Sequence, residues 1–177
     1  MRVSGQDVKD INTANLRDME SFVTQETHLF HDSIRANLRI AKLDATEEEI
    51  RAAAKTVCAD EFIMGLENGY KTEMYEGGSQ LSGGQRQLVS FARTLISDPK
   101  ILILDEATSS IDAKTEKELQ KGLQELLKGR TSFIIAHRLS TIKNCDKIMF
   151  ISITEAGTHD ELMAKKGDYY KLCMAQK

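Results

Sequence analysis

The chain has 177 residues, of which 41% are hydrophobic, and a formal net charge of -3. This length suits one domain with its own core, and the charge excludes a general electrostatic attraction to nucleic acid. The longest aliphatic runs, ILIL and FII, are far shorter than the roughly 20 residues that a membrane helix needs. Cys58, Cys145 and Cys173 lack the spacing of a metal or redox motif, which favours scattered reduced thiols.

The first half of the chain contains a strand and then a charged, helix-rich section. The strand is expected over residues 20–25 and ends at a polar side chain. Three helices and a closing loop should follow, at 33–38, 45–59, 59–66 and 70–80. Thr46 and Glu49 have the spacing of a capping box, which predicts where the second of these helices begins.

From Leu81 the pattern changes to helices that alternate with short aliphatic strands. The expected elements follow one another at 82–96, 101–105, 113–128, 131–136, 139–144, 147–151, 159–164 and 169–174. Continuous aliphatic strands separated by helices are typical of a mostly parallel sheet with helices on both faces. We therefore predict an α/β fold in which residues 31–80 form a helical lobe inserted between two strands of the sheet.

Two carboxylates follow the aliphatic strand ILIL. Asp105 would stand at the carboxyl end of that strand, the edge at which open α/β sheets bind ligands. An aspartate there can hold magnesium, which neutralises phosphate oxygens. Glu106, the next residue, could act as a general base towards an attacking water molecule. The alternative is an ordinary strand followed by a solvated acidic turn.

The segment LSGGQ places a serine and two glycines at the start of a predicted helix. Gly83 and Gly84 allow close approach of the backbone, and Ser82 supplies a hydroxyl group. Free amide groups and the helix dipole make such a start able to bind an anion. The alternative is a capped helix after a flexible loop. The segment is not a phosphate loop, because Gly84 occupies the position that the loop's lysine requires.

Two further polar residues follow predicted strands. His137 comes just after the aliphatic run FII, and Gln25 ends the strand at 20–25. A histidine in this position is often structural, but it could contact a phosphate group. The glutamine could bind a metal or orient a water molecule. Neither residue decides the function alone.

The order of these segments closely resembles the nucleotide-binding domain of ATP-binding-cassette (ABC) proteins. LSGGQRQ and ILILDEATSSID carry the resemblance, which extends over nearly the whole chain. It implies a P-loop-NTPase-like fold with an inserted helical subdomain. It also implies a division into an ATPase-core remnant with the Q-loop at 1–30, a helical subdomain at 31–80 and the remaining core at 81–177.

The resemblance assigns roles to individual residues. Gln25 is similar to the Q-loop glutamine, which touches magnesium and couples to membrane domains. Residues 101–105 look like Walker B, with Asp105 at the metal, and Glu106 looks like the catalytic glutamate. His137 looks like the switch histidine, which contacts the terminal phosphate.

The same resemblance implies the nucleotide contacts. Residues 81–85 are similar to the signature motif, in which Ser82, Gly83, Gly84 and Gln85 face the nucleotide. Residues 109–112 look like the D-loop, here Ser-Ser-Ile-Asp where Ser-Ala-Leu-Asp is common, with Asp112 at the site. ATP and magnesium are therefore the expected ligands.

The segments HLFHDSIRANL and YKTEMYEGGSQLSGG resemble the exporter branch of this family. Its loop before the signature usually carries Thr-x-x-Gly-Glu-x-Gly. Thr72, Glu76 and Gly78 match that pattern, whereas Tyr75 stands where a glycine is usual.

Both ends of the chain bear on the resemblance. MRVSGQDVKDINTANLR is similar to the hairpin that follows Walker A, so we expect a fragment that begins past Walker A. IMFISITEAGTHDEL is similar to a strand pair, but the usual Asp-x-Gly turn is missing from it.

The family resemblance implies an ATPase domain of an exporter, at the cytoplasmic face of the membrane through transmembrane domains outside this chain. Its expected partners are those domains and a second nucleotide-binding domain, paired head to tail, and no nucleic acid is expected. Without Walker A, the isolated chain should have negligible ATP affinity and turnover. Two alternatives remain: a non-catalytic module that donates its signature motif to a partner, and a non-transport ABC ATPase.

Overall fold

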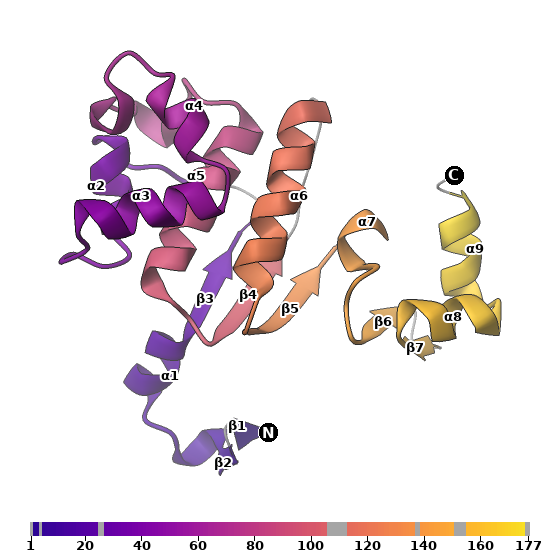
Figure 1. Cartoon of the computed structure of the whole chain (residues 1–177). Coiled ribbons are helices and arrows are strands. Elements are labelled where there is room, and N and C mark those ends of the chain that lie inside the picture. Colours follow the sequence, from indigo (N-terminus) through magenta and orange to yellow (C-terminus); the bar gives the residue numbers. More distant parts are fainter. Residues whose placement is uncertain are drawn as a thin grey trace. The chain divides into compact units, whose positions relative to one another are not determined.

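The structure is a computed structural model that describes residues 2–3, 5–24, 27–105, 113–136, 139–150 and 155–175. The chain divides into two compact units, Met1–Ile135 and Ala136–Lys177. The first unit carries a parallel sheet and the helical section, and the second carries a strand pair and short helices (Figure 1).

Three parallel strands form the sheet of the first unit in the order β3-β4-β5. They are β3 (Glu20–Val23), β4 (Ile101–Asp105) and β5 (Thr131–Ile135). Strands β3 and β4 are adjacent in the sheet although the whole helical section lies between them in the chain. The predicted parallel α/β fold is therefore confirmed.

A short hairpin and a helix precede β3. The hairpin pairs β1 (Arg2–Val3) with β2 (Gln6–Asp7) in antiparallel register, as the sequence predicted. A 3-10 turn (Val8–Asp10) leads to α1 (Thr13–Met19), which the sequence analysis missed. Its signal is local, because the Asn12 side chain accepts a hydrogen bond from the amide of Ala14 and caps the helix.

The helices between β3 and β4 gather in one lobe at the end towards which β3 points (Figure 1). They are α2 (Ile34–Arg39), α3 (Glu47–Thr56), α4 (Asp60–Met64) and α5 (Gly83–Ser97), with 3-10 turns at Gly69–Lys71 and Glu76–Gly78. The predicted capping box is present, since Thr46 and Glu49 bond to each other's backbone amides. Helix α6 (Ala113–Leu127) then connects β4 to β5.

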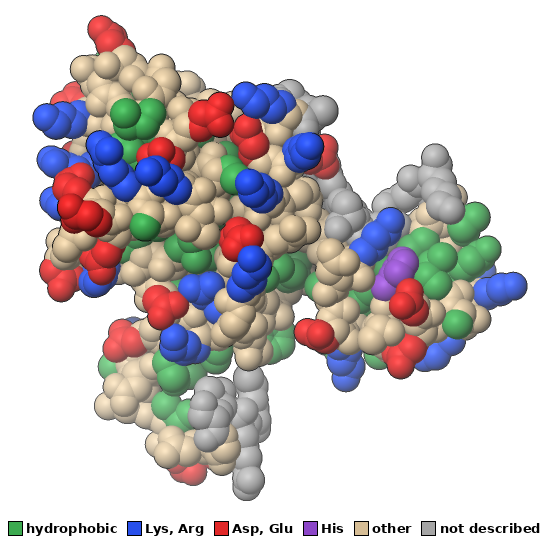
Figure 2. Space-filling view, in the orientation of Figure 1, with side chains coloured by type: hydrophobic (Ala, Val, Ile, Leu, Met, Phe, Trp, Pro, Cys, Tyr) green, Lys and Arg blue, Asp and Glu red, His purple; other side chains and the backbone are tan. Residues whose placement is uncertain are grey.

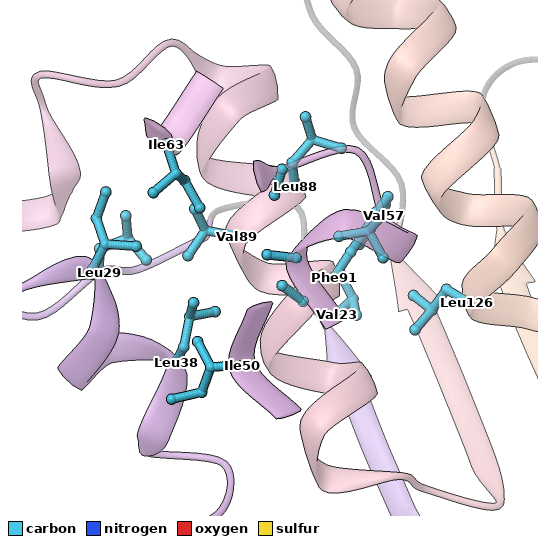
Figure 3. Packing of buried hydrophobic residues seen from close by; sticks show 14 of the residues in the cluster. Val23, Leu29, Leu38, Ile50, Val57, Ile63, Leu88, Val89, Phe91 and Leu126 are labelled. Carbon is cyan, nitrogen blue, oxygen red and sulfur yellow. The ribbon is translucent and has the colours of Figure 1, made fainter. Parts of the chain in front are cut away.

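The main core lies between one face of the sheet and the helices. Val23, Leu102 and Leu104 of that face are buried in one cluster with Leu88 and Phe91 of α5. Figure 3 shows side chains from the sheet, α3, α5 and α6 meeting in this cluster. Burial of each such side chain contributes about 1.5–3 kcal/mol, so this contact fixes α5 on the sheet.

The opposite face of the sheet is open within the described part of the chain. Register places Phe22, Ile103 and Phe133 side by side on it, and the first and last of these are 60% and 49% exposed. Ile135, on the same face, is 55% exposed. The expectations of helices on both faces and of a buried strand β5 are therefore not met here, because β5 is an edge strand with one face uncovered.

The second unit has its own small core. It contains α7 (Leu139–Ile142), the antiparallel pair β6 (Ile148–Phe150) and β7 (Glu155–Gly157), and the helices α8 (His159–Lys165) and α9 (Asp168–Ala175). Ile148, Leu162, Tyr169 and Cys173 form the buried cluster. The Glu155 carboxylate accepts hydrogen bonds from the first amides of α9, which ties the strand pair to that helix.

Tyr169 should make the second unit sensitive to alkali. Its phenol is fully buried and lies 2.9 Å from the His159 Nδ1 atom. Burial, with hydrogen bonding to Cys173, raises the pKa of Tyr169 from 10.0 to about 12. The folded state therefore favours the neutral phenol, and the resulting stability is present below pH 10.0 and lost as the pH rises towards about 12.

We expect the free energy of unfolding to fall more steeply between these pH values in the wild-type chain than in Tyr169→Phe. Urea unfolding followed by circular dichroism at a series of pH values measures the difference. Equal slopes for the two proteins would contradict the assignment.

Candidate functional site

The signature segment forms an exposed, capped helix start. Ser82 caps α5, because its Oγ accepts a hydrogen bond from the Gln85 amide at 3.2 Å and the Gln85 Oε1 accepts one from the Ser82 amide at 3.0 Å. Ser82 and Gly83 are exposed, whereas Leu81 is buried. The Ser82 hydroxyl accepts a hydrogen bond in this cap, so its own proton remains able to form a further hydrogen bond. The first backbone amides of a helix also have no intrahelical partner. This turn can therefore present several donors to an anion.

The loop before the signature is held by specific contacts. Gly77 and Gly78 have φ values of +70°, a conformation that side chains disfavour. Tyr75 has φ -79° and ψ 174°, so this position does not require the glycine that is usual in the family. Gln80 bonds to the amide of Tyr75, and Arg86 Nη1 bonds to the carbonyl of Leu81 at 2.6 Å. These bonds fix the approach of the chain to Ser82.

Gly78→Ala should lower the free energy of unfolding by about 2–3 kcal/mol. An added Cβ at Gly78 would lie 2.7 Å from Leu29 Cδ1, in addition to the strain of its positive φ. Gly77→Ala is the matched control, since Gly77 has the same φ but no heavy atom within 4 Å of the added carbon. Urea unfolding of both variants measures the difference, and equal losses would contradict a tight contact between Gly78 and Leu29.

Asp105 lies at the end of β4, where the sequence placed it. Its neighbour Leu104 is buried, while Asp105 itself is exposed and lies opposite Ile135 of β5. No ion pair involves Asp105 among the residues that the structure describes. A free carboxylate fits Mg²⁺, which usually takes one or two protein carboxylates together with phosphate oxygens and water. The described residues contain no cluster of three or more His, Cys, Asp or Glu side chains that could hold a metal.

The other predicted catalytic and metal-binding residues, Gln25, Glu106 and His137, lie outside the described residues, as does the predicted nucleotide contact Asp112. The strands that lead to Gln25, Glu106 and His137 are nevertheless described. Strand β3 ends at Val23, β4 at Asp105 and β5 at Ile135, and Val23 pairs with Leu104 while Asp105 pairs with Ile135. The chain therefore leaves all three parallel strands at the same edge of the sheet.

The signature turn and the strand edge are considered together in the proposed site, so the interactions between their described residues matter. Among the described residues, no hydrogen bond or ion pair connects Ser82 or Gln85 with Asp105. The two groups of predicted site residues thus belong to different parts of the first unit, one at the start of α5 and one at the end of β4.

Asn37 is a structural residue of this region that the sequence analysis missed. It is fully buried on α2, where its Oδ1 accepts from the Phe30 amide at 2.8 Å. Its Nδ2 donates to the carbonyls of Phe30, Asp32 and Ser33. The sequence signal for this role is a polar residue on the face of helix α2 that Ile34 and Leu38 bury in the core. Asn37 holds the segment that follows Gln25 against the helical lobe.

A groove lies between β3, the following segment and α5, with a cavity volume of about 430 Å³. Helix α5 contributes a polar row at helical spacing: Ser90, Arg93, Thr94 and Ser97. The other wall includes Glu20, the exposed rings of Phe22 and Phe30, and Thr24 and Thr27 on either side of residues 25–26. The described residues on either side of the predicted Q-loop therefore line this groove.

The parallel sheet, the helical lobe between β3 and β4, and the ligand-accessible strand ends define a P-loop-NTPase-like α/β domain. A family model described as "ABC transporter" matches residues 1–109. The chain belongs to this family.

Relatives place the chain in the exporter branch. It is 50% identical over 173 residues to an "ATP-dependent lipid A-core flippase" of Desulfotalea psychrophila (strain LSv54 / DSM 12343), covering 96% of this chain and 30% of the flippase. It is 49% identical over 179 residues to the "Uncharacterized ABC transporter ATP-binding protein YknV" of Bacillus subtilis (strain 168), covering 99% of this chain and 30% of that protein.

The solved "Structure of a bacterial Atm1-family ABC exporter with ATP bound" is similar with a TM-score of 0.86 and 38% identity, over 97% of this chain and 31% of the exporter chain. The resemblance to an exporter-type nucleotide-binding domain and the fold class are thus confirmed. This chain spans about 30% of the length of the two relatives. Within its described residues, every helix is too short or too polar to cross a membrane.

Proposed function

We propose that this chain is part of the ATP-binding and ATP-hydrolysing domain of an ABC exporter, that this domain couples hydrolysis to transport across a membrane, and that the chain alone is inactive. The observation that carries the proposal is the exposed carboxylate of Asp105 at the strand edge of a domain that also presents the capped LSGGQ turn. Substrate choice would then reside in the membrane domains rather than in these residues.

The signature turn would bind nucleotide held by a second domain. In a head-to-tail pair, the Ser82 hydroxyl and the amides of Gly83 and Gly84 would donate to the terminal phosphate of ATP on the partner domain. Gln85 and Asp112 would complete this wall. Charge that develops on the phosphate oxygens during in-line attack would be stabilised by these fixed donors.

The strand edge would serve the ATP bound in the same chain's pocket. Asp105 and Gln25 would hold magnesium, which supplies neutralisation of phosphate charge when bound. Glu106 would orient and deprotonate the attacking water, and His137 would contact the terminal phosphate. The parallel ends of β3, β4 and β5 support this grouping, since the segments that carry these residues leave the sheet at one edge.

The proposed partners are a second nucleotide-binding domain and transmembrane domains, which would hold this domain at the cytoplasmic face of the membrane. The proposed docking place for a membrane domain is the groove lined by Thr24 and Thr27, which flank the predicted Q-loop in the sequence. Charges of both signs are intermingled over the visible face of the helical lobe (Figure 2). We also propose that the chain divides into an ATPase-core part with the Q-loop at 1–30, a helical subdomain at 31–80 and the remaining core at 81–177.

Titration calorimetry with Mg-ATP tests whether the isolated 177-residue chain binds ATP. We expect affinity weaker than about 1 mM, because the sequence contains no glycine-rich loop with a lysine to surround the phosphates. Micromolar binding would contradict this expectation.

The alternative of a non-catalytic module rests on the exposed signature turn alone. Mixing the chain with an intact cassette distinguishes an ATPase domain from a non-catalytic module. The module is favoured if the chain stimulates ATP hydrolysis by the intact cassette but hydrolyses no ATP itself. If the intact protein is instead a non-transport ABC ATPase, it would show Mg-dependent hydrolysis with no membrane domain attached.

A further inference from the structure

Two of the three free cysteines share the core of the second unit. Cys173 of α9 belongs to its buried cluster, and Cys145 packs against the same cluster from the connection between α7 and β6. The pair has no local sequence signal, because its members lie on different parts of the chain. The fold of the second unit therefore brings together two thiols that the sequence separates.

Both thiols act on the phenol of Tyr169, which is fully buried in the same cluster. Burial is the main reason that the pKa of Tyr169 rises to about 12, and Cys173 through a hydrogen bond and Cys145 through its charge add to the rise. Effects of this kind act over a few ångströms, so both sulfur atoms lie around one hydroxyl group. The phenol also lies 2.9 Å from His159 Nδ1, so it keeps a polar partner if Cys173 turns away from it.

The two thiols differ in their access to solvent. Cys173 is 9% exposed, whereas Cys145 is only partly buried. A small molecule from solvent therefore reaches Cys145 first, and Cys173 is placed to react with Cys145 afterwards. Burial, and then the charge of Asp146, raises the pKa of Cys145, so its reactive thiolate is a minor form at neutral pH and thiol exchange there is slow.

We propose that Cys145 and Cys173 are a reversible disulfide pair that forms by exchange with glutathione disulfide. The Cys145 thiolate attacks one sulfur of glutathione disulfide, which forms a mixed disulfide and releases one glutathione. The Cys173 thiolate then attacks the Cys145 sulfur and releases the second glutathione. Two protein thiols are thereby oxidised, one glutathione disulfide is reduced, and the two thiol protons end on the two released glutathione molecules.

The bond would tie the connection after α7 to the last helix of the unit. It would close residues 145–173 into a loop that contains β6, β7 and α8. A disulfide needs Cα atoms about 4.4–6.8 Å apart, and Cys145 lies outside helix and strand, so its backbone can adjust to that distance. Such a cross-link restricts the unfolded chain and stabilises the folded unit. The redox state of the surroundings would thus set how firmly α9 is held.

The test equilibrates the 177-residue chain and its Cys58→Ser variant with glutathione and glutathione disulfide, in native buffer and in urea. Mass spectrometry counts the remaining thiols after alkylation, and peptide mapping identifies the linked residues. In native buffer, both proteins should lose two thiols and yield a Cys145–Cys173 link that excess glutathione reverses. The effective concentration of these two thiols for each other should exceed its value in urea by about tenfold or more.

Serine at either position of the pair should stop the reaction at a mixed disulfide with glutathione. If those variants fail to fold, the Cys58→Ser protein alone decides, because its only thiols are Cys145 and Cys173. Oxidation of that protein should also raise the urea concentration at which it unfolds. A mixed disulfide that persists in it, an effective concentration no higher than in urea, an unchanged unfolding midpoint, or a native bond to Cys58 in the wild type would each overturn the proposal.

Discussion

Replacing Glu106 with glutamine should lower the rate of ATP hydrolysis by the intact transporter by roughly 10²–10⁴-fold. Glutamine has nearly the same size and shape but cannot accept a proton from the attacking water. The residue directly follows Asp105, the last residue of β4, so the proposed base would lie next to the proposed metal ligand. Phosphate release under saturating Mg-ATP measures the rate, and retained nucleotide is measured separately by filter binding.

Glu67→Gln is a suitable control for this experiment, because Glu67 is an exposed residue of the helical lobe far from the strand edge in sequence. Its hydrolysis rate should match the wild type. If Glu106→Gln kept more than about a tenth of the wild-type rate, a general base at this position would be wrong. If the variant also lost ATP binding, its effect would be on binding instead.

Asn37→Ala should lower the free energy of unfolding by about 3 kcal/mol or more. The side chain is fully buried and bonds to the amide of Phe30 and to the carbonyls of Phe30, Asp32 and Ser33. Alanine would remove these bonds and leave backbone groups without their partner. Urea unfolding of the purified chain, followed by circular dichroism, measures the loss.

Asn68→Ala provides the comparison, because Asn68 is exposed and its side chain makes no capping hydrogen bond. We expect it to change stability by no more than about 0.5 kcal/mol. A loss below about 1 kcal/mol for Asn37→Ala would mean that the segment after β3 relaxes and finds other partners.

Features with local causes were predicted well. The capping box of α3 depends on residues three positions apart, so Thr46 with Glu49 could be identified directly. Ser82 was placed correctly at the start of α5, but its capping box with Gln85 was not predicted. Strand β4 was equally clear, because an unbroken aliphatic run is typical of a central strand in a parallel sheet. Asp105 follows from the same run, since the strand ends where the apolar residues end.

Features that depend on distant parts of the chain were predicted less well. The run FII in β5 indicated a buried strand, but exposure is decided by whether anything covers that face and edge, and Phe133 remains about half exposed. The groove beside β3 joins residues about 70 positions apart, such as Phe22 and Arg93, so no local pattern reveals it. The roles of Gln25, Glu106, Asp112 and His137 remain predictions.

Helix α5 carries both the proposed phosphate contact and the proposed docking wall. Ser82 caps its first turn, and Arg93 lies roughly 16 Å further along its axis, given a rise of about 1.5 Å per residue. Leu88, Val89 and Phe91 lock the stretch between them into the core, so the helix cannot lengthen or bend there cheaply. A displacement of Ser82 would therefore be passed along the helix to Arg93 rather than absorbed by bending between them.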